Sequence, residues 1–377
     1  MRAGAGTAPI TPTPPVWLAG FGDRTEPAET VYEDLEARAL YLSDGEAALC
    51  LIVCDLLGMT PDVASPLRDA VAAALGLQRS AVLIACTHTH AGPNCMTGGE
   101  RLGWHTPEGY HEVLRAGCTA AATAARGASE PATIRYASAA LPEALSFNRR
   151  GSLYADPMFA VLDVLRPDGD RIATVANFGI HPVALGPVGL EVATDWVGAF
   201  RTELEARVGG VAIHLAGALG DINPQPPNRS IEDDTYAPWC SHEETDAIGR
   251  ALAAAVVDAI ALARPSDGRL RVIRDTTIDV QLGTTALTQL GDLTGARTVR
   301  LIEWDVGGVR VVAIPGEGFD AHGREIVASR HGPVLLAGLS PEWHGYLPYP
   351  WGAGYEEGVS YGEDAVAAIN AALLDAP

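Results

Sequence analysis

The chain has 377 residues, of which 47% are hydrophobic and 19% are charged, a composition that predicts a globular fold with a substantial core. Its formal net charge of −21 argues against nucleic acid or an anionic membrane surface as a partner. All 26 basic residues are arginine, which excludes a Schiff-base lysine, a pyridoxal phosphate enzyme and a lysine-dependent phosphate loop.

No targeting or membrane-spanning segment is predicted. The N-terminal residues lack the continuous apolar stretch of a signal peptide. The most apolar long stretch, residues 251–263, is too short to span a bilayer and contains Asp258. We therefore expect a cytoplasmic protein without stable membrane association, built as one catalytic domain over residues 1–377.

Strands and helices are expected along the whole chain. In order, the patterns predict a hairpin over 37–55, helices over 61–76 and 107–127, a strand over 133–141, a hairpin over 158–180, helices over 196–207 and 243–262, strands over 271–282, 297–316 and 333–340, and a closing helix over 364–374. Hairpins beside β-α alternation predict an α/β fold, with a mixed β-sheet core and helices on both faces.

Five apolar runs each end in a short polar turn rich in glycine or proline. The runs occupy residues 81–86, 171–180, 211–220, 309–314 and 333–339. The turns that follow them carry His88 and His90, then His181, Asp221, Glu317 and Tyr346. Open α/β sheets bind ligands beyond the carboxyl ends of their strands. The sequence therefore predicts one convergent site, and its residue types indicate a metalloenzyme.

His88 and His90 are separated by one residue. On an extended segment, both side chains would point to the same face. Two adjacent imidazoles suppress each other's protonation, and the neutral ring is the form that binds a divalent metal. Taken alone, surface or helix-capping histidines remain the more common explanation of this pattern.

The other turn residues each have an ordinary structural explanation. His181 ends a buried strand and could be a satisfied core histidine, while Glu317 between two glycines could cap a helix or lie in a solvated loop. Tyr346 could be a packing aromatic, and Asp221 could form an Asx turn. Their joint position at strand ends favours function, because two histidines and a glutamate form a common catalytic zinc site with an open position.

The ordered motifs resemble the catalytic N-terminal domain of the neutral/alkaline (non-lysosomal) ceramidase family, in its short bacterial form. The motifs are Thr87-His88-Thr89-His90-Ala91-Gly92-Pro93, Asn148-Arg149, His181-Pro182, Thr194-Asp195-Trp196, Gly220-Asp221-Ile222-Asn223-Pro224, Pro315-Gly316-Glu317 and Gly345-Tyr346. Members of this family are zinc-dependent amidohydrolases that cleave N-acylsphingosine. By position, the resemblance implies that Zn²⁺ is bound by His88, His181, Glu317 and Tyr346, and that His90 and Arg149 face the substrate amide.

Two features depart from the family pattern. Asn223 stands where well-known members carry a serine implicated in catalysis, and no C-terminal β-sandwich domain is expected in this chain. Since an amide side chain is not a nucleophile, we expect attack by a metal-activated water, with Asn223 positioning water or substrate. Arg149 or His90 would stabilise the oxyanion, and His90 or Asp221 would transfer the proton.

The expected function is hydrolysis of an amide or related acyl bond in a small soluble molecule. This substrate class follows from charged residues between Glu317 and Tyr346 and from the polar segment after Pro224. One alternative is a zinc-dependent acyl-transfer or cyclising enzyme of small-molecule metabolism, with an amine as acceptor. Another is a non-catalytic binding protein that keeps the fold. The oligomeric state is not predicted.

Overall fold

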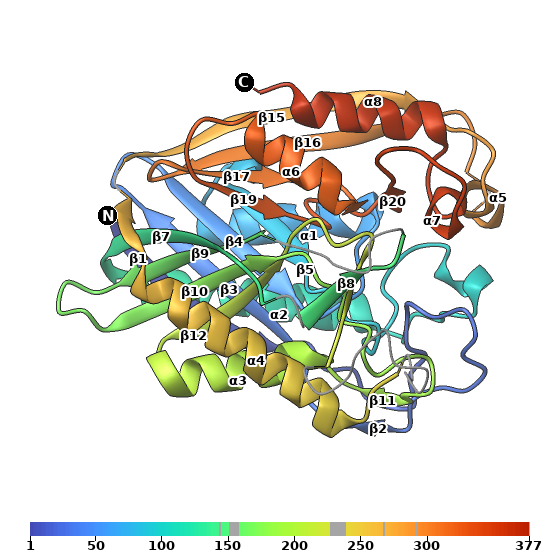
Figure 1. Ribbon diagram of the computed structural model, residues 1–377, viewed down its shortest axis with the longest axis horizontal. Helices are drawn as coiled ribbons and strands as arrows, with labels where there is room; N and C mark the ends of the chain where they lie inside the picture. The colour runs from blue at the N-terminus through green and yellow to red at the C-terminus, as the bar shows by residue number, and fades with distance from the viewer. Residues whose placement is uncertain (143–144, 151–157, 227–238, 267, 292, 377) are drawn as a thin grey trace.

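A computed structural model describes residues 1–142, 145–150, 158–226, 239–266, 268–291 and 293–376. Three mixed β-sheets form its framework, and each sheet carries helices on its outer side (Figure 1). Among the described residues, none of the helices is long and apolar enough to cross a membrane.

The first sheet contains the N-terminal strands. Its order is β5 (Val82–Cys86), β4 (Ala48–Cys54), β3 (Glu36–Ser43), β1 (Arg2–Pro9) and β6 (Glu130–Pro131), and α1 (Pro61–Leu75) and α2 (Tyr110–Gly127) pack on it. The predicted hairpin over 37–55 is confirmed, because β3 and β4 pair antiparallel. The sequence patterns missed β1, an Ala/Gly-rich strand. A Cβ at Gly6 would come within 2.6 Å of the Ala121 carbonyl oxygen, so glycine lets α2 pack directly on this strand.

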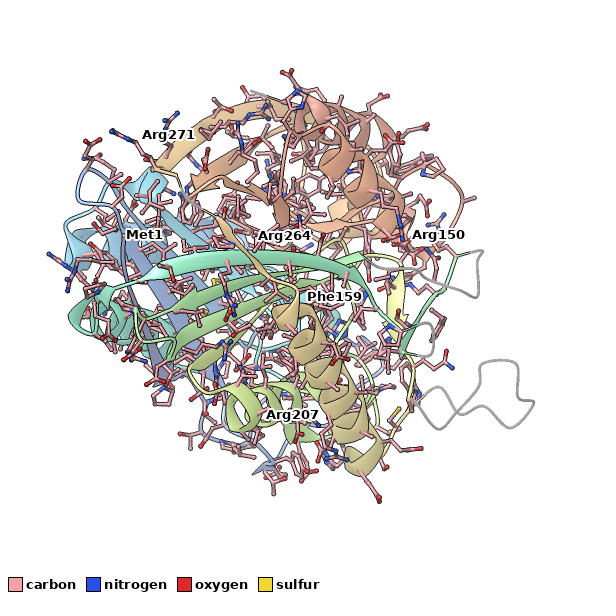
Figure 2. All side chains as sticks on the ribbon, turned by 60° about the vertical axis from the view of Figure 1, so that its left-hand side comes forward. Met1, Arg150, Phe159, Arg207, Arg264 and Arg271 are labelled. Atoms are coloured by element: carbon pink, nitrogen blue, oxygen red, sulfur yellow. The ribbon has the colours of Figure 1, made fainter. Side chains whose placement is uncertain are left out.

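The second sheet contains the hairpin predicted over 158–180. Its order is β12 (Val211–Ala216), β10 (Arg171–Phe178), β9 (Met158–Leu165), β7 (Thr133–Ala140) and β14 (Arg264–Ser266). The two predicted helices, α3 (Trp196–Val208) and α4 (His242–Ala261), pack against each other and on this sheet. Figure 2 shows α4 running across the strand layer that carries Phe159.

The third sheet is formed by the C-terminal part of the chain. Its order is β15 (Leu270–Gln281), β16 (Ala296–Val306), β17 (Val309–Ala313) and β19 (Val334–Ala337). Helices α6 (Asp320–Ala328) and α8 (Glu363–Leu374) pack on this sheet. They lie on the side of the molecule opposite α3 and α4 (Figure 1). The sequence patterns missed α6.

Short elements connect the three sheets. These are the strand pairs β2 (Thr30–Val31) with β11 (Glu191–Val192), β8 (Ser146–Asn148) with β13 (Ile222–Pro224), and β18 (Glu317–Gly318) with β20 (Tyr346–Leu347), the 3₁₀ turns Arg79–Ala81 and Gly99–Leu102, and the short helices α5 (Ala286–Leu290) and α7 (Tyr355–Gly358).

The inner faces of the three sheets share one apolar core. Leu51 of the first sheet, Val175 of the second and Leu335 of the third belong to the same buried cluster. Burying aliphatic side chains of this kind stabilises the fold by roughly 1.5–3 kcal/mol each. The predicted α/β class with mixed sheets and covering helices is confirmed, and the strands are divided among several sheets.

The carboxyl ends of β5, β10, β12 and β19 lie next to one another. The Asn177 side chain at the end of β10 bonds both the N–H and the carbonyl of Leu336 in β19, at 2.8 and 2.7 Å. Gly338 donates to the carbonyl oxygen of Ala216 at 2.7 Å, and Ser340 Oγ donates to that of Ile84 at 2.9 Å. The turns that follow these strands therefore meet in one region, as the sequence predicted.

Candidate metal centre and active site

His88 lies two residues beyond the end of β5. Its φ of 73° is in the left-handed region, so the expectation of an extended segment is wrong at this residue. The His88 and His90 rings nevertheless lie with their centroids 4.9 Å apart, edge to face. His88 Nδ1 is 2.6 Å from the carbonyl oxygen of Leu57, which directs Nε2 away from the backbone.

His181 follows β10 and is fully buried. Its Nδ1 lies 3.2 Å from the carbonyl oxygen of Ile222, and its own carbonyl accepts a hydrogen bond from Trp196 Nε1 at 3.1 Å. Trp196 begins α3, and the side chain of Asp195 caps that helix. The Thr194-Asp195-Trp196 motif therefore supports the turn that carries His181. Burial is the main reason why the pKa of His181 is lowered to about 4.

Glu317 begins β18 and pairs with Tyr346 of β20 in the parallel register. Its Oε2 lies 3.2 Å from His88 Nε2 and 3.2 Å from His181 Nε2. Burial by itself would raise the pKa of this carboxyl group. The facing imidazoles outweigh burial and hold the pKa of Glu317 well below its usual range.

The tautomer of His181 follows from its partners. A carbonyl oxygen can only accept, so the Nδ1 facing Ile222 carries the proton, and the ring is neutral at pH 7 because its pKa is about 4. Nε2 then directs a lone pair toward Oε2 of the ionised Glu317. Two acceptors facing each other in a buried site repel unless a proton or a metal ion lies between them. His88 Nδ1 likewise faces the Leu57 carbonyl oxygen, and its Nε2 faces Glu317 Oε2, so the geometry of this donor set fits a divalent metal.

His90 is the third imidazole of the site. The ligand nitrogens of His88, His90 and His181 lie within 4.8 Å of one another. Neither nitrogen of the buried His90 ring has a hydrogen-bond partner in the described part of the chain. Burial and the two neighbouring imidazoles lower the pKa of His90 well below its usual value, so this ring is neutral at pH 7. The structure therefore adds a possible third imidazole ligand to the four that were predicted.

Arg149 connects the predicted residues on the other side of the site. Its guanidinium donates to Asn223 Oδ1 at 3.2 Å, to the Tyr346 hydroxyl at 3.2 Å, to Glu356 Oε1 at 2.8 Å and to the Gly220 carbonyl at 2.6 Å. These bonds use four of its five N–H groups. The fifth, on Nη1, has no partner among the described residues.

Asp221 lies apart from the cavity wall. Its Oδ2 accepts from Asn148 Nδ2 at 2.6 Å, and its Oδ1 accepts from the backbone N–H of Asp320 at 2.8 Å. Asp221 thus joins β8 to the start of α6. Burial raises the pKa of this carboxyl group, but its bonds are those of a structural turn residue.

A cavity of about 570 Å³ opens on this site, a volume in the range of ligand pockets. His88, His90, Arg149, His181, Asn223, Glu317 and Tyr346 all line it. The lining also includes aromatic and aliphatic side chains: Phe21, Leu57, Trp104, Val183, Trp239, Leu287, Trp343, Tyr355 and Val359. Most of these residues lie in loops, Leu287 lies in the short helix α5 and Tyr355 begins the short helix α7, so no long periodic pattern marked them in the sequence.

Two solved structures are similar to this chain. The crystal structure of neutral ceramidase from Pseudomonas aeruginosa superimposes with a TM-score of 0.84 over 99% of this chain and 73% of that one, at 18% identity. This chain has the neutral ceramidase fold. A ceramidase complexed with C2 gives a TM-score of 0.81 over 99% of this chain and 74% of that one, also at 18% identity.

The resemblance proposed from the motifs is thus confirmed as a shared fold. No protein-family model matches the sequence, and no similar sequence is found among curated proteins. The motifs that carried the resemblance were short and widely spaced. Their joint order along the chain was informative where overall identity was too low for a sequence match.

The prediction of a small soluble substrate rested on two segments of the sequence, and the structure does not support it for the segment after Glu317. The charged residues after Glu317 lie on or beside α6, and none of them lines the cavity. Arg324 pairs with Asp320 at 2.8 Å, and Arg330 pairs with Glu303 at 2.9 Å. The polar segment after Pro224 falls mainly in residues 227–238, which lie outside the described residues. The described cavity wall is instead largely apolar.

Proposed function

We propose that this protein is a zinc-dependent amidohydrolase. The observation that supports the proposal best is that three potential metal-ligand atoms, one from a carboxylate and two from imidazoles, lie close together. Glu317 Oε2 lies 3.2 Å from the Nε2 atoms of His88 and His181, and each of these rings bonds a backbone carbonyl through Nδ1. Two histidines and one carboxylate are a common protein ligand set for catalytic zinc. Tyr346 and His90 are the further candidate ligands at this centre.

The metal, when bound, supplies Lewis-acid chemistry, the kind that makes water nucleophilic at neutral pH and polarises a carbonyl group. In the proposed reaction, water adds to the amide carbonyl carbon, the C–N bond breaks, and the amine leaves with a proton. Asn223 lines the cavity but offers no nucleophile, so water is the attacking group.

Arg149 is proposed to stabilise the developing oxyanion. Four bonds to Asn223, Tyr346, Glu356 and Gly220 fix its guanidinium, and the remaining N–H on Nη1 is available to a substrate oxygen. A donor held in place before the reaction stabilises charge without reorganisation. The contact of Arg149 Nη1 with Asn223 makes Asn223 a positioning residue in this proposal.

His90 is proposed to carry the proton to the leaving amine if it is not itself a ligand. Its ring lines the cavity, is neutral, and has both nitrogens without partners among the described residues. Asp221 is a weaker candidate, because Asn148 and Asp320 already use its two oxygens.

The cavity supports a substrate amide that carries an apolar group. Trp104, Trp343 and Tyr355 line the same cavity and would contact that group. A series of N-acyl compounds of increasing chain length, compared by kcat/KM, tests this proposal. The small-substrate proposal predicts that short chains are preferred to long-chain ceramide in mixed micelles, and the opposite order would contradict it.

Metal content tests the proposed function directly. Purified protein is expected to carry about one zinc per chain, and His181→Ala is expected to lose most of it because a ligand is removed. Elemental analysis by mass spectrometry measures both. His322→Ala is the matched control, since His322 is equally buried but its Nε2 lies 3.1 Å from the carbonyl oxygen of Asn370 and it does not line the cavity. Full zinc occupancy in His181→Ala would show that the assignment is wrong.

A further inference from the structure

We propose that Trp343 is a positioning residue that fixes the Glu317 carboxylate so that one oxygen alone faces the metal centre. This inference rests on the proposed metal site. The indole Nε1 of Trp343 donates to Glu317 Oε1 at 3.0 Å. The other oxygen, Oε2, is the atom that lies 3.2 Å from both His88 and His181.

A glutamate ligand needs this kind of control. Its terminal torsion is broad, so a free carboxylate turns easily and offers one or both oxygens to an ion. A hydrogen bond to Oε1 stabilises the orientation in which Oε2 alone points to His88 and His181. Groups that hold a metal ligand in this way commonly change metal affinity when they are removed.

Trp343 is itself held firmly by the backbone around it. Its N–H donates to the carbonyl oxygen of Met59 at 2.7 Å, and the next residue, His344, donates to the carbonyl oxygen of Pro315 at 3.1 Å. A Cβ at Gly58 would come within 3.1 Å of the Trp343 side chain, so glycine allows the ring to lie close against this loop. The segment that carries the indole is thus fixed to the turns after β4 and β17.

Hydrogen bonds between buried side chains anchor the same segment from its other side. His344 Nε2 is 3.1 Å from Glu342 Oε1, and His344 Nδ1 is 3.0 Å from the Tyr361 hydroxyl. All three residues are buried. Trp343 lies between these anchored neighbours. Its indole Nε1–H therefore has a defined direction toward Glu317.

Trp343 also lines two cavities. Trp343, Trp104 and Leu287 line both the cavity at the metal centre and a second chamber of about 320 Å³. A truncation at Trp343 would therefore remove a wall together with the hydrogen bond. Trp104 provides the matched control for the wall, because its Nε1 donates to the backbone oxygen of Phe21 at 3.2 Å and bonds no proposed metal ligand.

The test compares metal affinity in the full-length protein. Wild type, Trp343→Phe and Trp104→Phe are stripped of metal and titrated with Zn²⁺ against a chromophoric chelator. Trp343→Phe is expected to bind zinc about 10–100-fold more weakly, the usual effect of losing a group that orients a ligand. Trp104→Phe is expected to match the wild type. The visible spectrum of the Co²⁺-loaded proteins should differ between Trp343→Phe and wild type, because the freed carboxylate changes the coordination.

The outcomes separate this inference from the proposed function. If wild-type protein binds no zinc, both fail. If wild type and Trp343→Phe bind zinc with equal affinity, only the role of Trp343 is overturned. Should Trp343→Phe not fold, benzothienylalanine incorporated at position 343 keeps the ring shape and removes the N–H. Weakened zinc binding in that protein supports the inference, and unchanged binding overturns it.

Discussion

Asn223 shows how one residue type changes the chemistry open to a site. Its amide cannot attack a carbonyl carbon, but its Oδ1 accepts a hydrogen bond from Arg149 Nη1 at 3.2 Å. Arg149 in turn bonds Tyr346 and Glu356. Asn223 therefore acts on the reaction through the direction of a guanidinium group.

Replacing Asn223 with alanine is expected to slow turnover without ending it. The loss should be on the order of 10–1000-fold in kcat, the scale of one mispositioned hydrogen-bond donor. Zinc content should not change, because Asn223 is not a proposed ligand. Asn223→Asp is the control: it keeps an oxygen acceptor for Arg149 and should lose less activity. A trapped covalent acyl–enzyme adduct would contradict attack by water.

At the scale of elements, the strand ends approach so closely that they require glycine. A Cβ at Gly179, after β10, would overlap the carbonyl oxygen of Ala218. Gly179→Ala is therefore expected to lower the free energy of unfolding by about 1–3 kcal/mol, as overpacking does. Gly127, the last residue of α2, has open space around its position and is the control. Gly127→Ala should be neutral or slightly stabilising, and urea unfolding measures both.

Equal stability in the two glycine variants would mean that the turn carrying His181 is not tightly packed. That result would weaken the case for a preformed site. The packing matters to function because Gly179 is two residues before His181, and a shift there would move a proposed ligand.

The packing of α3 on the second sheet gives the protein a predicted acid sensitivity. His214 of β12 lies with its ring centroid 4.7 Å from that of Phe178 and 4.9 Å from that of Trp196. Burial, followed by the charge of Arg201, lowers the pKa of His214 to about 3. Between pH 6.5 and 3 the unfolded chain binds a proton at this position that the folded chain does not.

This histidine should therefore stabilise the fold above pH 6.5 and destabilise it progressively as the pH falls toward 3. The slope is at most about 1.4 kcal/mol per pH unit for one group. His214→Phe is expected to flatten the dependence of the unfolding free energy on pH between 7 and 5. An unchanged slope in His214→Phe would refute the prediction.

At the scale of the whole molecule, the candidate metal centre joins turns that follow strands of all three sheets. His88 follows a strand of the first sheet, His181 one of the second and Glu317 one of the third. A ligand that binds the folded state alone stabilises it by about 2.7 kcal/mol at 100 times its dissociation constant. A metal at this point should therefore stabilise the entire framework.

Chelation is accordingly expected to lower the melting temperature of the wild-type protein, and added Zn²⁺ should restore it. His181→Ala should melt at the same temperature with and without chelator, because its site is already impaired. Differential scanning calorimetry checks both proteins. A melting temperature of wild type that does not respond to chelator would argue against a metal that links the three sheets.

The sequence by itself determined the elements and the candidate residues. Periodicity located both long hairpins and the helices α1, α3, α4 and α8, because these depend on residues close in the chain. The position of polar residues after apolar runs located the ligand candidates. The sequence patterns missed two elements. In β1 the Ala/Gly composition gave a weak strand signal, and in α6 the amphipathic pattern was short.

Only the tertiary structure decided how those candidates meet. His181 and Glu317 are 136 residues apart, and their contact depends on which strands pair and how three sheets pack. The left-handed backbone at His88 and the bond from Trp343 to Glu317 likewise have no local sequence signal. The apolar part of the cavity lining is assembled from distant loops and two short helices. Non-local contacts follow from the packing of the whole chain, whereas periodicity reports only on neighbours along it.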